Sequence, residues 1–91
     1  MTEEPPAGEL GRLQIVVRLP SGKRLERAFQ SSEMVGLIYD FVDMQQLDEL
    51  EGKKYRLFSN MPRTVYEDRE ATLESAGIGN KFVLMVEVLA L

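Results

Sequence analysis

Only one segment of this 91-residue chain repeats its apolar residues at the spacing of an α-helix, and strand-like segments lie on both sides of it. The helical segment carries its apolar stripe at Val35, Ile38, Phe41 and Val42, a pattern typical of a helix with one buried face. A single helix has to bury this face against another layer, and the other apolar segments have the short lengths of β-strands. The pattern therefore predicts a two-layer α+β domain in which one helix covers one face of a sheet.

Five segments have the pattern of strands in this sheet. The first alternates, so Ile15 and Val17 are expected on the face opposite to Val16 and Arg18. In the second, Arg27 shares a face with apolar residues, which predicts a position near the edge of the sheet. The last is the most apolar of the five, which is typical of a central strand. The predicted strands are residues 12–19, 23–29, 53–59, 64–66 and 81–88.

The segments between the strands complete the predicted topology. Residues 20–22, Pro-Ser-Gly, indicate a turn between the first two strands, and Ser31 or Ser32 is expected to cap the helix. Residues 72–77 suffice for a single helical turn, which Gly77 would end. The resulting order predicts a β-grasp, a mixed sheet wrapped over one helix. The expected sheet side of the core consists of Ile15, Val17, Leu57, Leu84 and Val86.

The length of the chain allows one domain. Residues 1–11 contain two prolines and two glycines, and we expect them to be a flexible tail or the stub of a linker. Residues 12–91 are expected to form the folded domain. No apolar run approaches the length of about 18 residues that a membrane-spanning helix needs, and the N-terminus lacks the basic and apolar regions of a signal peptide.

Cysteine and histidine are both absent from the chain. Their absence excludes the usual zinc, thiolate and haem ligands, cysteine nucleophiles and catalysis by histidine. Carboxylate chemistry remains, but the chain has no calcium-loop or phosphate-binding motif. We therefore expect no enzyme activity, no cofactor and no metal. Because small secreted domains usually carry disulfides, the lack of cysteine also favours the cytoplasm or the nucleus.

Charge is distributed unevenly along the chain, whose net charge is −4. Residues 12–27 carry five basic residues and one acidic residue, whereas residues 40–51 carry five acidic residues and no basic one. Both clusters are expected to be solvated faces of a small domain. The isoelectric point near 4.8 and the lack of a basic stripe with interleaved aromatic residues argue against nucleic acid as a partner.

Several segments together resemble the UBX domain, a family with the ubiquitin-like β-grasp fold. The resemblance extends over residues 12–88, which is nearly all of the expected domain. It is carried by residues 15–22 (Ile-Val-Val-Arg-Leu-Pro-Ser-Gly), 25–29 (Leu-Glu-Arg-Ala-Phe), 38–42 (Ile-Tyr-Asp-Phe-Val), 61–63 (Met-Pro-Arg) and 72–78 (Thr-Leu-Glu-Ser-Ala-Gly-Ile).

The resemblance implies a non-catalytic, monomeric module cut from a longer adaptor protein. UBX domains dock onto the N-terminal domain of the hexameric AAA+ ATPase valosin-containing protein, in ubiquitin-dependent protein processing or degradation. They use an arginine of the first strand and a Phe-Pro-Arg loop between the third and fourth strands. By position, these residues are Arg18 and the loop Asn60-Met61-Pro62-Arg63.

This chain departs from the family pattern at Met61, where the family has phenylalanine. Methionine can fill the same kind of cleft, but ordering its side chain costs about 1–2 kcal/mol of rotamer entropy. We therefore expect the same binding site with reduced affinity. The chain ends in Val-Leu-Ala-Leu rather than Gly-Gly, so we do not expect it to be a conjugated modifier.

Two other interpretations stay open at this point. The chain could be a different ubiquitin-like module, of the Ras-association or PB1 type, which binds its partner through the open face of the sheet or through the basic hairpin of Lys23, Arg24 and Arg27. It could also be a small enzyme that uses aspartate and glutamate, which would require a pocket with paired carboxylates.

Overall fold

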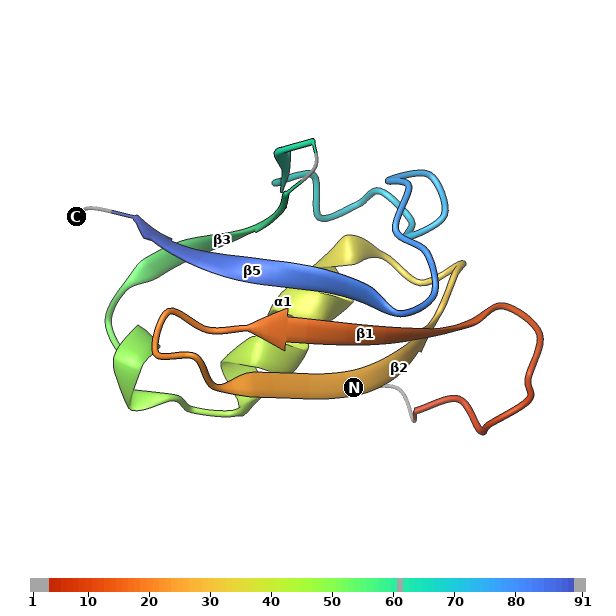
Figure 1. Cartoon of the computed structure of the whole chain (residues 1–91), viewed down its shortest axis with the longest axis horizontal. Helices are drawn as coiled ribbons and strands as arrows, with labels where there is room; N and C mark the ends of the chain where they lie inside the picture. Colours follow the sequence, from red (N-terminus) through yellow and green to blue (C-terminus); the bar gives the residue numbers. More distant parts are fainter. Residues whose placement is uncertain (1–3, 61, 90–91) are drawn as a thin grey trace.

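Residues 4–60 and 62–89 are described by a computed structural model (Figure 1). Within them, five strands, one α-helix and one 3₁₀-helix follow one another along the chain. These are β1 (Arg12–Arg18), β2 (Arg24–Gln30), α1 (Val35–Met44), η1 (Asp48–Leu50), β3 (Lys54–Ser59), β4 (Thr64–Tyr66) and β5 (Phe82–Leu89). The predicted strands agree with the observed ones to within one residue at each end.

The strands form one mixed sheet in the order β2-β1-β5-β3-β4. β1 is parallel to β5 and antiparallel to β2, and β3 is antiparallel to both β5 and β4. The apolar β5 therefore lies at the centre of the sheet and β2 at an edge, as predicted. α1 crosses one face of the sheet, behind β1 and β5 in Figure 1, so the fold is the expected β-grasp.

The core lies between α1 and the sheet, and it contains the five sheet residues that the sequence predicts. From the predicted helical stripe, Val35, Ile38 and Val42 are fully buried. Phe41 differs from the prediction because it is only partly buried. Its ring packs against the edge of β2, with its centroid 6.0 Å from that of Phe29 in an edge-to-face arrangement.

Tyr39 is a core residue that the sequence pattern did not indicate. Its side chain is 1% exposed. The hydroxyl donates a hydrogen bond to the carbonyl oxygen of Tyr66 (2.6 Å) and accepts one from the backbone N–H of Leu57 (2.9 Å). Leu57 and Tyr66 form the β3–β4 pair that lies farthest from the connection between these two strands. The hydroxyl therefore joins the helix to both strands, and burial raises its pKa.

The start of α1 is capped by backbone groups, so the prediction of a serine cap is wrong. Met34 occupies the N-cap position and makes no side-chain capping hydrogen bond. The N–H groups of Val35 and Gly36 donate instead to the carbonyl oxygens of Ala71 (2.8 Å) and Arg69 (2.9 Å). Residues 69–71 thus satisfy the free N–H groups of the first turn, which makes a capping hydroxyl unnecessary.

The segment before β5 forms the expected turn. The N–H of Ala76 donates to the carbonyl oxygen of Thr72 (3.0 Å), and Gly77 has a left-handed φ of +78°, as its predicted C-cap role requires. At the other end of the chain, a carboxylate oxygen of Glu4 accepts a hydrogen bond from the N–H of Ala28 on β2 (2.9 Å). No helix in the described part of the chain is long and apolar enough to cross a membrane.

Candidate protein-binding face

A row of three side chains crosses the face of the sheet opposite to α1. Because successive residues of a strand point to opposite faces, the neighbours of buried Val17 and Leu57 lie on this open face. Arg18 of β1 pairs with Met85 of β5, and Met85 pairs with Phe58 of β3. We call Arg18, Met85 and Phe58 the central row. The three residues border a shallow hollow of about 300 Å³.

Glu87 connects two arginines beside this row. One carboxylate oxygen accepts a hydrogen bond from Nε of Arg56 (2.6 Å), and the other accepts one from Nη2 of Arg63 (2.8 Å). The hydrogen bond from Arg63, followed by that from Arg56, holds the pKa of Glu87 below its usual value. Glu87 therefore remains ionised in neutral solution and holds Arg63 against the sheet.

The connection between β3 and β4 contacts the central row through Arg63 at one end of the connection and through Asn60 at the other. The guanidinium carbon of Arg63 lies 4.5 Å from the centroid of the Phe58 ring, within the range of a cation–π interaction. At the other end, Nδ2 of Asn60 lies 3.6 Å from the sulfur of Met85. The side chain of Arg63 remains half-exposed, so it is both oriented by the sheet and open to a partner.

The structure brings four of the five predicted binding residues to this open face or its border. Arg18 is exposed, and its guanidinium makes no hydrogen bond or ion pair within residues 4–60 and 62–89. Asn60 and Arg63 contact the row, and Pro62, also exposed, lies between them in the chain. Met61 lies outside the described residues. The role of these residues in binding stays a prediction.

Phe58 and Glu87 belong to this face, but the sequence analysis did not include them in the site. Leu57 and Ser59 are both buried, so the alternation of β3 turns Phe58 to the open face. The sequence could therefore have indicated Phe58 as a residue of the open face, because it is an aromatic residue between two residues that face the core. The role of Glu87 depends on the register between β3 and β5, which places it opposite Arg56 and which no local pattern specifies.

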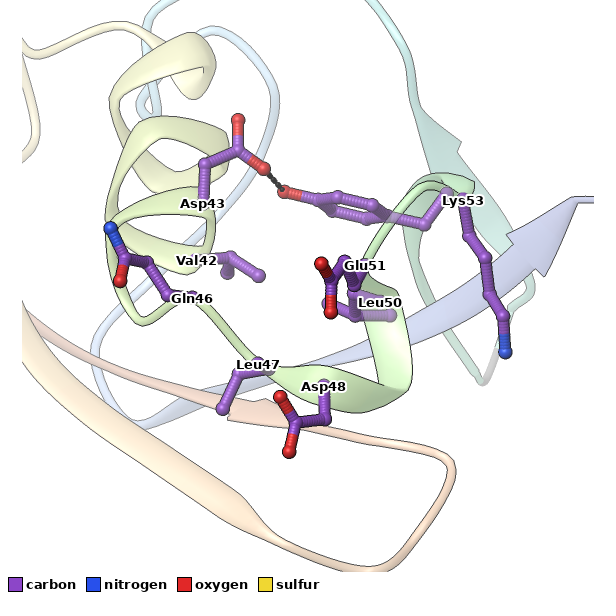
Figure 2. Close-up of a pocket in the computed structure, with 9 residues that line it drawn as sticks. Val42, Asp43, Gln46, Leu47, Asp48, Leu50, Glu51 and Lys53 are labelled. Atoms are coloured by element: carbon purple, nitrogen blue, oxygen red, sulfur yellow. Dashed lines mark hydrogen bonds between the residues drawn. The ribbon is translucent and has the colours of Figure 1, made fainter.

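A larger hollow, about 470 Å³, lies between the end of α1, η1 and the start of β3 (Figure 2). The carboxylates of Asp43, Asp48 and Glu51 line it, and all three residues are exposed. The hydroxyl of Tyr55 donates to Asp43 (2.6 Å), and burial together with this hydrogen bond raises the pKa of Tyr55, so it cannot act as a base near neutral pH. Lys53 points away from the carboxylates in Figure 2. The hollow therefore offers solvated carboxylates and does not favour the enzyme interpretation.

The basic hairpin exposes fewer basic residues than the sequence suggested. Arg27 is 8% exposed, its Nη1 donates to the carbonyl oxygen of Ala28 (3.1 Å), and its guanidinium carbon lies 4.7 Å from the centroid of the Phe29 ring. Lys23 and Arg24 remain exposed. An anionic partner would thus meet two cations here instead of three, which weakens the alternative that binds through this hairpin.

The fold and this open face define the class of the domain, which is a ubiquitin-like β-grasp module. A solved structure of a UBX domain superposes with a TM-score of 0.83 at 27% identity and covers all of this chain, which in turn covers 82% of that structure. A ubiquitin-like domain of an Arabidopsis thaliana protein has the same fold, with a TM-score of 0.71 at 16% identity over all of this chain and 92% of its own.

The chain belongs to the UBX domain family, whose model matches residues 9–87. It is 39% identical to plant UBX domain-containing protein 10 of Arabidopsis thaliana over 94% of this chain and 18% of that protein. It is 35% identical to plant UBX domain-containing protein 13 of the same plant over 89% of this chain and 15% of that protein. The chain thus spans less than a fifth of the length of these two relatives. The domain is a ubiquitin-like protein-interaction module, and neither relative is described as an enzyme.

Proposed function

We propose that this domain docks onto the N-terminal domain of the AAA+ ATPase valosin-containing protein through the open face of its sheet. One observation carries the proposal: Arg18 and the β3–β4 connection, which are far apart in the sequence, meet at the same central row. Arg18 borders the hollow at Phe58 and Met85, Arg63 lies over Phe58, and Asn60 contacts Met85. These are the positions that the family resemblance assigns to docking.

The chemistry of the row suits a protein partner with acidic or carbonyl acceptors around an apolar cleft. Arg18 and Arg63 provide guanidinium groups that can donate two parallel hydrogen bonds to a carboxylate. Phe58 and Met85 provide apolar surface next to them. Because Glu87 and Phe58 already orient Arg63, this side chain loses less conformational entropy on binding than a free arginine does.

The wider role that we propose is that of an adaptor. The domain would attach the ATPase to whatever the rest of a longer protein holds, in ubiquitin-dependent processing or degradation in the cytoplasm or nucleus. The relatives support this division of labour, because this domain matches only a small part of each of them.

The experiment is an NMR titration of the ¹⁵N-labelled domain with the isolated N-terminal domain of valosin-containing protein. We expect shift changes centred on Arg18 and residues 60–64. In Arg63→Ala and in Arg18→Ala, loss of a charged hydrogen-bond donor should weaken binding at least tenfold, since such bonds contribute about 1.5–3 kcal/mol.

Arg24→Ala is the matched control because it also removes one exposed arginine from a strand, but from the basic hairpin. It should leave the dissociation constant within about twofold, as expected for an exposed charge outside the interface. Loss of binding in Arg24→Ala with unchanged binding in Arg63→Ala would overturn the proposed site and favour the hairpin. The absence of shifts at high micromolar partner concentration would overturn the choice of partner.

A further inference from the structure

α1 and its N-cap residue carry a second line of apolar residues, which borders the stripe that faces the core. Met34, Leu37, Phe41 and Met44 follow one another at intervals of three, four and three residues. This spacing places their side chains along one line of the helix, as in the seam of a coiled coil. We call these four residues the outer stripe. Leu37 and Phe41 pack against the edge of the core, whereas Met34 and Met44 at the two ends stay exposed.

The outer stripe is exposed at its two ends and partly covered between them. Met34 is 55% exposed and Met44 is 62% exposed, and Leu37 and Phe41 between them are partly buried. Helices at the surface of a monomer usually present polar residues on the side away from the core. Exposed apolar side chains such as Met34 and Met44, joined by the partly exposed Leu37 and Phe41, are instead typical of a binding surface.

A hollow of about 420 Å³ opens at the N-terminal end of this stripe, lined by residues that include Met34, Gly36 and Leu37. Gly36 has no side chain, which lets the backbone of Arg69 approach the first turn: a Cβ at residue 36 would lie 3.1 Å from the carbonyl oxygen of Arg69. Arg69 also lines the hollow, but its guanidinium carbon lies 3.9 Å from the centroid of the Tyr39 ring, so it is already engaged with α1. The hollow can therefore receive an apolar side chain from outside.

The segment that carries the outer stripe is acidic, and two of its acidic residues, Glu33 and Asp40, line the hollow together with Arg69. Residues 31–52, which contain α1 and η1, have six acidic residues and no basic one. Asp40 is exposed and lines the hollow next to Leu37, and its carboxylate makes no hydrogen bond or ion pair within the described part of the chain. A partner that covers the stripe has to bring its own positive charge to this border, because an opposite charge attracts and a second acidic helix repels.

We propose that the outer stripe of α1 binds an amphipathic helix of a partner protein, with lysine or arginine residues beside its apolar face. Apolar residues at intervals of three and four on that helix pack along Met34, Leu37, Phe41 and Met44, and a basic residue pairs with Asp40. α1 covers the sheet face opposite to the central row, so this surface and the open face can be occupied at once. The domain then joins two proteins by itself, independently of what binds the open face.

The test uses a synthetic helical peptide of about 18 residues, which is five helical turns. The peptide has leucine along one face at heptad spacing and lysine at the bordering positions. A second peptide with glutamate in place of each lysine is the charge control. We expect the lysine peptide to shift the amide signals of residues 34–44 of the ¹⁵N-labelled domain, and the glutamate peptide to bind at least tenfold more weakly.

Two pairs of variants locate the site. The double variant Met34→Ser with Met44→Ser should weaken binding at least tenfold, whereas Leu10→Ser, which changes an apolar residue that is 93% exposed elsewhere, should have no effect. Asp40→Lys should weaken binding about fivefold, whereas Glu9→Lys, which changes the net charge equally, should leave it unchanged. All these side chains are exposed, so the variants should keep the fold, which the amide spectrum verifies.

Three results would overturn the proposal. The first is a lack of shifts on α1 at millimolar lysine peptide, and the second is equal binding of the lysine and glutamate peptides. The third is dimerisation of the domain in sedimentation velocity that the double serine variant abolishes, because the stripe would then bind a second copy of this chain.

Discussion

Tyr39→Phe should destabilise the domain far more than the loss of one oxygen atom suggests. The substitution leaves the ring in the core but removes the hydroxyl that bonds the carbonyl oxygen of Tyr66 and the N–H of Leu57. Both groups belong to the pair of β3 and β4 residues farthest from their connection. Leu57 and Tyr66 are both buried, so a water molecule has little access to them. A buried polar group left without a partner costs about 1–3 kcal/mol, so two of them should lower the free energy of unfolding by about 2–6 kcal/mol.

Urea denaturation followed by circular dichroism measures this difference. The midpoint should fall while the slope of the transition stays the same, because the surface exposed on unfolding is nearly unchanged. For a domain of this size, about 4–8 °C of melting temperature corresponds to each kcal/mol. The thermal midpoint should therefore fall by at least about 8 °C in a parallel thermal scan.

Tyr55→Phe is the matched control. The hydroxyl of Tyr55 donates to the exposed carboxylate of Asp43 and lies 3.2 Å from the carbonyl oxygen of Tyr39, and the Asp43 carboxylate can turn to water when the hydroxyl is removed. The expected loss is below about 1 kcal/mol. Equal destabilisation by the two substitutions would refute the reasoning, because it would mean that β3 and β4 close directly over the missing hydroxyl.

Three further predictions concern the binding face and the start of the helix. Met61→Phe, which restores the family residue, should tighten binding to the N-terminal domain about fivefold or more, since a ring loses less rotamer entropy than methionine; calorimetric titration measures it, and weaker binding would contradict it. The carboxyl of Glu87 should titrate below its ordinary pKa of 4.5 in carbon-detected NMR and return towards it in Arg63→Ala. Because this pKa is lowered on folding, the contribution of Glu87 to stability is present above the ordinary pKa and is lost as the pH falls through the lowered one; Glu87→Gln should remove that part of the acid dependence. Gly36→Ala should destabilise by about 1 kcal/mol in urea denaturation despite the better helix propensity of alanine, because the new Cβ would lie 3.1 Å from the carbonyl oxygen of Arg69.

The two proposed surfaces differ in how far the sequence could reveal them. The family resemblance located Arg18 and residues 60–63 without any structure, but it did not show what lies between them. Of the outer stripe, the sequence pattern had assigned Phe41 to the buried face of the helix. The meaning of this stripe changed once the structure showed that Met34 and Met44 stay exposed and that residues 69–71 cap the helix, leaving no role in the core or in capping for Met34.

The sequence by itself determined the elements, their order, the edge position of β2 and the central position of β5. These properties depend on local periodicity and on how much of each segment is apolar, and both can be read from neighbouring residues. The tertiary structure decided which groups meet across the sheet: Glu87 with Arg56 and Arg63, Tyr39 with Leu57 and Tyr66, and residues 69–71 with the first turn of α1. Such contacts join residues that are distant in the chain, and they depend on strand register and on the path of the connections. Those are fixed only when the whole core packs, because no local pattern contains both partners.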